Sequence, residues 1–254
     1  MVAYGGVDAL IWLCRSSKSI RLHHLTTTIL AMLAEKESIR PVIITKWALP
    51  PLLFLVRFYT TDHKKSPANS IHSSITPTLT NSNIPSDTTQ TSESRQSIVL
   101  EIVINCTHIL YQLSRAGILS QKELVSDGVF DTLLNLAGFH IQNLQYEKGV
   151  VEGSPIPTNS DDEQQLHERV NIIQSLAAKA ISAISSLVSF QPTMIELIEG
   201  TDRLSSLLRS QNAEVRKYVA KTIAYLSLRN DKYKPTLLYG DGSKALVSIL
   251  AVLP

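Results

Sequence analysis

The stretch GGVDALIWLC (5–14) begins a pattern that returns four more times along the chain. The later copies are WALPPLLFLV (47–56), GVFDTLLNLA (128–137), EGTDRLSSLL (199–208) and DGSKALVSIL (241–250). One leucine holds the same place in every copy, at Leu10, Leu52, Leu133, Leu204 and Leu246, with successive separations of 42, 81, 71 and 42 residues. A period of roughly 40 residues predicts a solenoid of stacked helical units. The two longer separations fit one such unit plus an insertion.

A second motif alternates with the first and has the spacing of a buried helix. Its copies are LTTTILAMLA (25–34), THILYQLSR (107–115), AAKAISAISSLVS (177–189) and VRKYVAKTIAYLSL (215–228). In the last copy, Val215, Val219, Ile223 and Leu226 fall along one stripe of a helix. Shorter amphipathic segments precede later copies of the first motif, at ESIRPVIIT (37–45), SQKELVSDG (120–128) and QPTMIELIEG (191–200). The sequence therefore predicts three helices in each unit.

Local signals also favour helices. Ser120 and Glu123 have the spacing of a capping box, and Asn212 stands where it can cap the helix that follows. Gly117 and Gly128 mark helix ends. No sustained alternation of apolar and polar residues, bounded by hairpin turns, is present. We therefore expect an all-α fold.

Two segments differ sharply in composition from the rest. Residues 60–97 are nearly half Ser and Thr and contain three prolines, and residues 145–165 are polar and acidic. Such segments cannot bury enough apolar surface to offset chain entropy, so both are expected to be disordered insertions. Each lies after a copy of the first motif and before a copy of the second. A solenoid tolerates long loops at such a joint, which independently supports the repeat assignment.

These motifs resemble the armadillo repeat. TKWALPPLLFLV (45–56) is similar to the second helix of that repeat, with Trp47 where Gly is usual. AEVRKYVAKTIAYLSL (213–228) is similar to the third helix, with Tyr225 where Asn is usual. The resemblance implies a right-handed α-solenoid of three-helix repeats that forms a single domain over residues 1–254. A two-helix solenoid is the nearest alternative fold.

The resemblance also implies a binding surface, because armadillo third helices line a concave groove. Importin-type members carry a Trp there, and an Asn four residues later, to clamp an extended peptide. The corresponding residues here are Thr28 and Met32, His108 and Gln112, Ser182 and Ser186, and Lys221 and Tyr225. None of these pairs is Trp–Asn, so an importin-like role is not expected. The predicted groove is mixed and mildly polar, with Tyr225 as an anchor for a protein or peptide partner. His108 is either a structural histidine or a partner contact that depends on pH.

Composition and motifs exclude several other functions. The chain has 254 residues, 44% of them apolar, and a net charge of +2, so it is not expected to bind nucleic acid. It has no nucleophile elbow and no phosphate-binding loop. His23 and His24 are adjacent and would point about 100° apart on a helix, which is a poor metal chelate. Cys14 and Cys106 fall within apolar runs and are expected to be reduced thiols. No cofactor or metal is expected.

The function that follows is a non-catalytic interaction scaffold. The alternative is a regulatory region of a larger enzyme, and the resemblance suggests a lipase-type α/β-hydrolase domain beyond Pro254. Both ends of the chain, GGVDALIWL and ALVSILAVLP, are apolar, so we expect a piece of a longer polypeptide.

The segment PVIITKWALPPLLFLVRFY (41–59) is apolar enough to suggest a membrane span. It also contains Lys46, Arg57 and the pair Pro50-Pro51, and a charge at the centre of a bilayer costs about 3 kcal/mol. We therefore expect two buried helices with a break at Leu49-Pro50, and a bilayer-embedded segment is the alternative. The N-terminus shows no cleavable signal, so a cytoplasmic location is expected.

Overall fold

The computed structural model describes residues 5–60, 90–140, 160–199 and 201–228. Every regular element in these ranges is a helix, as the sequence predicts. The fifth copy of the first motif, with Leu246, lies outside the described residues. Most of the two predicted insertions lies outside them as well.

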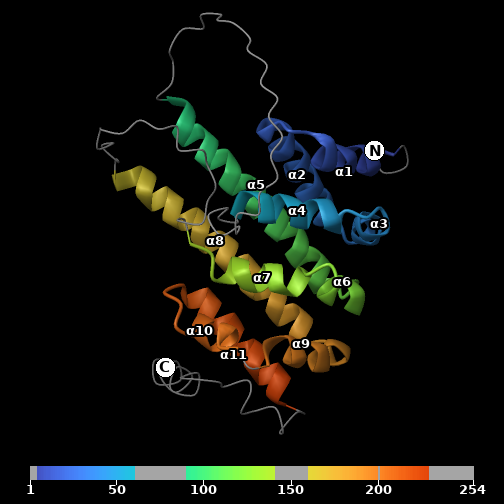
Figure 1. The fold of residues 1–254 in the computed structure, drawn as a ribbon, viewed down its shortest axis with the longest axis vertical. Helices are drawn as coiled ribbons and strands as arrows, with labels where there is room; N and C mark the ends of the chain where they lie inside the picture. The colour runs from blue at the N-terminus through green and yellow to red at the C-terminus, as the bar shows by residue number, and fades with distance from the viewer. Residues whose placement is uncertain (1–4, 61–89, 141–159, 200, 229–254) are drawn as a thin grey trace, which may run out of the picture.

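The helices form four successive layers (Figure 1). The first layer contains α1 (Gly6–Ser16) and α2 (Ile20–Ala34). The second contains the 3₁₀ turn η2 (Glu37–Ile39), α3 (Arg40–Thr45), α4 (Leu49–Thr60) and α5 (Gln90–Arg115). The third contains α6 (Gln121–Val125), α7 (Val129–Ala137) and α8 (Ser160–Ser185). The fourth contains η5 (Val188–Phe190), α9 (Gln191–Ile198), α10 (Arg203–Leu207) and α11 (Ala213–Ser227).

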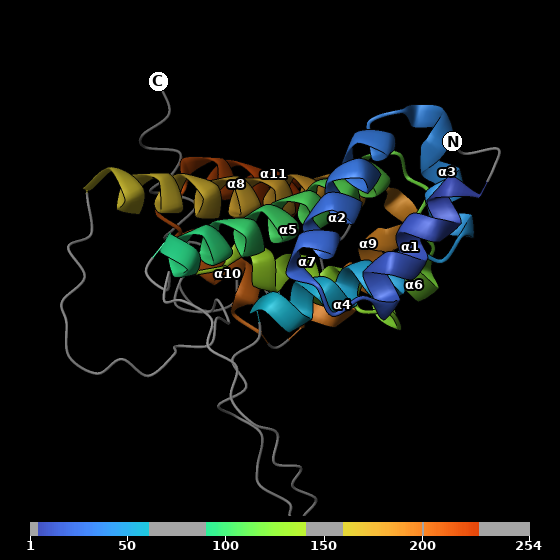
Figure 2. The same cartoon turned by 90° about the horizontal axis from the view of Figure 1, so that it is seen from above.

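Equivalent helices of successive layers lie side by side. The third helices α2, α5, α8 and α11 form one row, and the second helices α1, α4, α7 and α10 form another (Figure 2). The short first helices α3, α6 and α9 lie together at one side of the stack (Figures 1 and 2). Each layer contacts mainly its neighbours, as expected for a solenoid.

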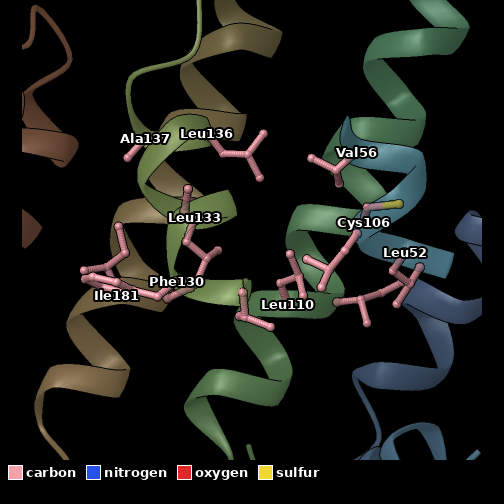
Figure 3. Packing of buried hydrophobic residues seen from close by; sticks show 14 of the residues in the cluster. Leu52, Val56, Cys106, Leu110, Phe130, Leu133, Leu136, Ala137 and Ile181 are labelled. Atoms are coloured by element: carbon pink, nitrogen blue, oxygen red, sulfur yellow. The ribbon is translucent and has the colours of Figure 1, made fainter. Parts of the chain in front are cut away.

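The core lies between the two rows of helices. The anchor leucines of the described copies, Leu10, Leu52, Leu133 and Leu204, are all buried in one apolar cluster. Figure 3 shows this packing, with side chains from α4, α5, α7 and α8 meeting between the rows. Burial of one such leucine stabilises the fold by about 1.5–3 kcal/mol, and the repeat pattern distributes this gain along the stack. Cys14 and Cys106 are buried free thiols in the same cluster, and burial raises the pKa of both.

A left-handed residue precedes three of the four second helices. Gly5, Trp47 and Gly128 have φ values of 74°, 59° and 75°, and each lies five residues before an anchor leucine. Glycine adopts this conformation at little cost, whereas a residue with a side chain does not. Trp47 therefore stands at the glycine position of the repeat and has the left-handed backbone conformation that Gly5 and Gly128 have.

A recurring contact fixes the register between layers. Arg40 Nε donates to the carbonyl oxygen of Ala34 at 2.8 Å, and Gln191 Nε2 donates to that of Ser185 at 3.0 Å. In both cases the donor follows the acceptor by six residues and is itself followed by a proline. Ala34 in α2 and Ser185 in α8 are therefore equivalent.

Two further pairs extend this register to the remaining third helices. Thr27 and Thr107 are buried threonines whose hydroxyls each donate to the carbonyl four residues earlier, in α2 and α5 respectively. Ser19 and Asn212 are the N-cap residues of α2 and α11, and both accept from backbone amides. Residue n of α2 thus corresponds to n+80 in α5, n+151 in α8 and n+193 in α11.

The predicted insertions extend too far into the third helices. Helix α5 begins at Gln90 rather than after residue 97, and α8 begins at Ser160 rather than after residue 165. The first turns of these helices are polar, and composition alone assigned them to the loops. Once the buried part of a helix is fixed, each added residue costs little, so the helix propagates beyond the core.

One described helix is long and apolar enough to cross a membrane, namely Arg95–Arg115 within α5. Two pairs of helices, each joined by a sharp bend, are long and apolar enough only if both helices of the pair count as one span. They are Glu37–Thr45 with Leu49–Thr60, which meet at 86°, and Gln164–Ser185 with Val188–Ile198, which meet at 94°. The apolar face of α4, with Leu49, Leu52 and Leu55, is buried against other helices. Packing in the stack therefore surrounds these side chains with apolar groups.

Candidate interaction surface

The outward faces of α2, α5, α8 and α11 form what is called here the third-helix surface. Of the eight residues predicted to line it, Met32, Ser186 and Lys221 are exposed. Thr28, His108 and Tyr225 are partly buried. Gln112 and Ser182 are only 7% and 4% exposed.

The prediction for α8 is out of register. Because Ser185 is equivalent to Ala34, the residues equivalent to Thr28 and Met32 are Lys179 and Ala183, not Ser182 and Ser186. The sequence AAKAISAISSLVS contains small residues at several helical spacings, so it can be aligned with the other copies in more than one way. Burial of Ile181 and Ile184 fixes the alignment, and this turns Ser182 inward.

A group of charged and aromatic side chains lies on the third-helix surface of α8 and α11. It is called here the Lys–Tyr cluster and comprises Lys179, Glu214, Lys217, Tyr218, Lys221 and Tyr225. Lys179 and Lys217 both contact the Glu214 carboxylate, and Lys221 lies over the Tyr225 ring, so the cluster holds three cations and one anion. Sequence analysis identified Lys221 and Tyr225 but missed Lys179 and Tyr218, although Lys179 lies within the second motif.

The contacts within this cluster span two repeats. Lys179 Nζ lies 5.5 Å from the ring centroid of Tyr218 and 3.6 Å from a carboxylate oxygen of Glu214. Lys217 Nζ lies 5.3 Å from the same ring and 3.2 Å from the other carboxylate oxygen. Lys221 Nζ lies 5.5 Å from the centroid of Tyr225. Each cation–π contact of this kind contributes about 0.5–1 kcal/mol at an exposed site. The contacts hold the lysine side chains in place and leave positive charge at the surface.

A groove of about 790 Å³ opens beside the cluster, between α8 and the start of α11. Its lining includes Asn171, Ser175, Lys179, Asn212 and Glu214. The Asn212 side chain shapes its floor. Its Oδ1 accepts from the backbone amide of Glu214 at 3.0 Å, and its Nδ2 lies 3.0 Å from the carbonyl oxygen of Asn171 and 3.2 Å from Ser175 Oγ. The residue that was predicted to cap α11 therefore also ties this helix to α8.

A second polar group lies on α5. His108 Nε2 lies within hydrogen-bond distance of Gln112 Nε2, at 3.2 Å. Glu35 Oε1 of α2 lies 3.8 Å from the same His108 nitrogen. Burial lowers the pKa of His108, and the nearby Glu35 carboxylate acts in the opposite direction. The Gln112 Oε1 atom is buried and has no hydrogen-bond partner. An unpaired acceptor of this kind costs stability, about 1–3 kcal/mol, unless a donor reaches it.

Among the described residues, no three His, Cys, Asp or Glu side chains gather closely enough to hold a metal ion. His23, which the sequence places next to His24, is buried instead and bonds within the core. Its Nε2 donates to the carbonyl of Ser17 at 2.9 Å, and its Nδ1 accepts from the Tyr59 hydroxyl at 2.8 Å. Both ring nitrogens are thus occupied by structural contacts.

On the second-helix side, arginines connect the layers. Arg57 Nη2 donates to the carbonyl oxygen of Asp127 at 3.0 Å, and Arg203 Nη1 lies 2.6 Å from Asp131 Oδ1. Both arginines line a groove of about 440 Å³. Because each is engaged with α7 or the turn before it, this groove is part of the packing between layers.

No protein-family model matches the chain, and no curated protein matches it in sequence. Its structure is similar to that of computationally designed armadillo repeat proteins for modular peptide recognition, with a TM-score of 0.60 and 15% sequence identity. That match covers 100% of this chain and 78% of the other. An engineered protein from the Northeast Structural Genomics Consortium matches with a TM-score of 0.50 and 17% identity, over 97% of this chain and 72% of the other. At these identities the likeness shows the fold alone: the chain is an armadillo-like α-solenoid.

Proposed function

We propose that the chain is a non-catalytic scaffold that binds a protein or peptide partner along the third-helix surface, with the Lys–Tyr cluster as the anchor. The observation that carries the proposal is the arrangement of Lys179, Lys217 and Lys221 against two tyrosine rings, with Glu214 contacting only the first two lysines. Tyrosine and positioned cations are typical anchors of protein interfaces. The groove between α8 and α11 provides concave space next to them.

The net charge of the Lys–Tyr cluster indicates which kind of peptide complements it. The cluster has two more cationic than anionic side chains, since it contains three lysines and one glutamate. An Asp- or Glu-containing peptide, with an aromatic or aliphatic residue to cover Tyr218 or Tyr225, complements it. Such a peptide would gain charge-assisted hydrogen bonds from lysines that are already held in place.

Selection from a library of displayed 12-residue peptides tests this proposal. We expect the selected peptides to be rich in Asp and Glu, and to bind the double variant Lys221→Ala/Tyr225→Ala at least tenfold more weakly in fluorescence polarisation. The control is Lys122→Ala on α6, whose Nζ lies 5.8 Å from the Trp47 ring away from this surface. Equal binding to the wild type and to a folded double variant would exclude the anchor.

The alternative role, as a regulatory region of a larger enzyme, stays a prediction.

A further inference from the structure

The first third helix, α2, presents an apolar stripe on its outer side. The stripe consists of Leu22, Leu25, Ile29 and Leu33, whose spacings of 3, 4 and 4 residues place them on one face of the helix. Leu22 is 39% exposed and Leu25 is 55% exposed, while Ile29 and Leu33 are partly buried. This stripe is called here the α2 edge.

In the other third helices the residues equivalent to Leu22, Ile29 and Leu33 are buried, and those equivalent to Leu25 (Asn105, Leu176 and Tyr218) are partly buried. Leu22 corresponds to Ile102 in α5, Ile173 in α8 and Val215 in α11. Ile29 corresponds to Ile109, Ala180 and Thr222 in the same three helices, and Leu33 corresponds to Leu113, Ile184 and Leu226. All nine are at most 1% exposed. The third helices lie side by side in chain order, α2 with α5, α5 with α8, and α8 with α11. On this side, Asn105 donates to Thr28 of the preceding helix, and the Tyr218 ring lies against Lys179 of the preceding helix. A neighbouring helix is therefore the regular occupant of this surface.

No element among the described residues buries Leu22 and Leu25, in the N-terminal half of the α2 edge. Its apolar side chains have the spacing that seats a parallel or antiparallel helix in the rest of the stack. The repeat geometry therefore indicates that a helix fits the α2 edge and lies alongside α2 as α2 lies alongside α5.

Charge indicates which kind of helix fits. From Ala9 to Ala34 the sequence contains no Asp or Glu, and Lys18 and Arg21, shortly before Leu22 in the sequence, are exposed. At the other end Lys36 stands between Glu35 and Glu37, so its charge is offset. A second copy of the chain would bring an α2 with the same cations and no acidic residue within the helix. A helix with acidic flanks has the complementary charge.

We propose that the α2 edge docks an amphipathic helix of a partner protein. The apolar face of that helix covers Leu22, Leu25, Ile29 and Leu33, and acidic side chains on its flank face Lys18 and Arg21. The partner helix extends the row of third helices by one member. This surface is separate from the Lys–Tyr cluster, which lies on α8 and α11.

Two designed peptides test the proposal on the full chain. Both are single amphipathic helices with leucine at every a and d position of a heptad repeat, and they carry either glutamate or lysine at the e and g positions. Fluorescence anisotropy is expected to show saturable binding of the glutamate peptide and binding of the lysine peptide that is at least tenfold weaker. The double variant Leu22→Glu/Leu25→Glu is expected to weaken binding of the glutamate peptide at least tenfold. Because both leucines are exposed, these substitutions leave the core intact.

Three further variants sharpen this test. Val188→Glu, at a site in η5 that is 55% exposed, is the matched control and is expected to bind like the wild type. Lys18→Glu/Arg21→Glu is expected to reverse the preference between the two peptides. Lys221→Ala/Tyr225→Ala is expected to leave the binding of both peptides unchanged, which separates this proposal from the proposed function.

Several results would overturn the proposal. They are the absence of binding by the glutamate peptide, equal binding by the wild type and the edge variant, and an unchanged preference in the charge-reversed variant. Sedimentation gives a further outcome. A wild-type dimer that Leu25→Glu converts to a monomer would make a second copy the occupant and refute the acidic partner helix.

Discussion

The Tyr59 hydroxyl of α4 donates to His23 Nδ1 of α2 at 2.8 Å, and their rings meet edge to face at 6.0 Å. The contact links the first two layers inside the core. Burial lowers the pKa of His23, while its bond to the Ser17 carbonyl opposes the shift. Burial also raises the pKa of Tyr59 to about 12, so the phenol stays a donor at physiological pH.

The lowered pKa of His23 makes stability depend on pH. Below about pH 6.5, the usual pKa of histidine, the unfolded chain binds protons that the folded chain does not. The free energy of unfolding is therefore expected to fall as the pH is lowered from 6.5, through the pKa that His23 has in the folded chain. Urea titrations of the wild type and His23→Gln between pH 5 and pH 8 check this, and the variant is expected to show a shallower fall. If the free energy of unfolding falls equally with pH in the wild type and the variant, His23 does not contribute to the pH dependence. His108 adds to the effect in the same direction, because its pKa is also lowered.

Trp47 has a positive φ at a glycine position, which predicts an unusual order of stability for two variants. Alanine normally stabilises a chain relative to glycine. At φ 59° the order is expected to reverse, with Trp47→Gly more stable than Trp47→Ala by about 1 kcal/mol. Both variants lose the contact between Lys122 and the indole, so that loss cancels in the comparison. Thermal and chemical denaturation measure the difference, and an alanine variant at least as stable as the glycine variant would contradict the strain.

Gly128 and Gly138 form a matched pair at the two ends of α7. A Cβ on Gly128 would meet Arg57 Nη2 at 2.5 Å and would also require φ 75°. A Cβ on Gly138 would meet its nearest atom at 3.5 Å, which is ordinary contact. We expect Gly128→Ala to reduce the free energy of unfolding by about 1–3 kcal/mol and Gly138→Ala to change it by less than about 1 kcal/mol. Equal effects in chemical denaturation would show that the turn before α7 is not constrained in this way.

Gln112 and Gln174 are each 7% exposed but differ in their hydrogen bonds. Gln174 Nε2 donates to the Phe139 carbonyl at 2.7 Å, and its Oε1 lies 3.2 Å from Asn212 Nδ2. Gln112 Oε1 has no partner. Replacing Gln174 by methionine is therefore expected to lower the free energy of unfolding by about 1–3 kcal/mol more than replacing Gln112, because it leaves the buried Phe139 carbonyl unpaired, whereas Gln112 contacts only the partly buried His108 ring. Urea denaturation of the two variants measures this difference in the free energy of unfolding. A larger loss at Gln112 would indicate that its unpaired oxygen has a partner in solution.

Residue spacing predicted much of the fold, because burial in a solenoid repeats with the unit. Leu10, Leu52, Leu133 and Leu204 are buried at equivalent places, and both the capping box at Ser120 and the cap at Asn212 form as expected. Helix starts at Gln90 and Ser160 were not predictable from composition, since polar residues extend a helix whose core is already packed.

The interaction surface was harder to predict than the fold. Lys221 and Tyr225 follow directly from the third-helix pattern, whereas Lys179 and Tyr218 become neighbours only when α8 and α11 pack together. The small residues around Ser182 allow several alignments, and only burial of Ile181 and Ile184 selects one. The α2 edge was not predictable either, because Leu22 has the spacing of a core residue, and its equivalents Ile102, Ile173 and Val215 are buried while Leu22 itself is exposed.

Zero-length carbodiimide cross-linking tests the Lys–Tyr anchor most directly. The reagent joins a carboxylate to an amine only where the two are in contact, so an acidic peptide selected on the wild-type chain reports the lysines that it touches. Mass spectrometry is expected to map the products to Lys179, Lys217 and Lys221, with loss of the product at residue 221 in Lys221→Ala. Products confined to other lysines, such as Lys46 or Lys122 on the opposite side of the stack, would contradict binding at the third-helix surface.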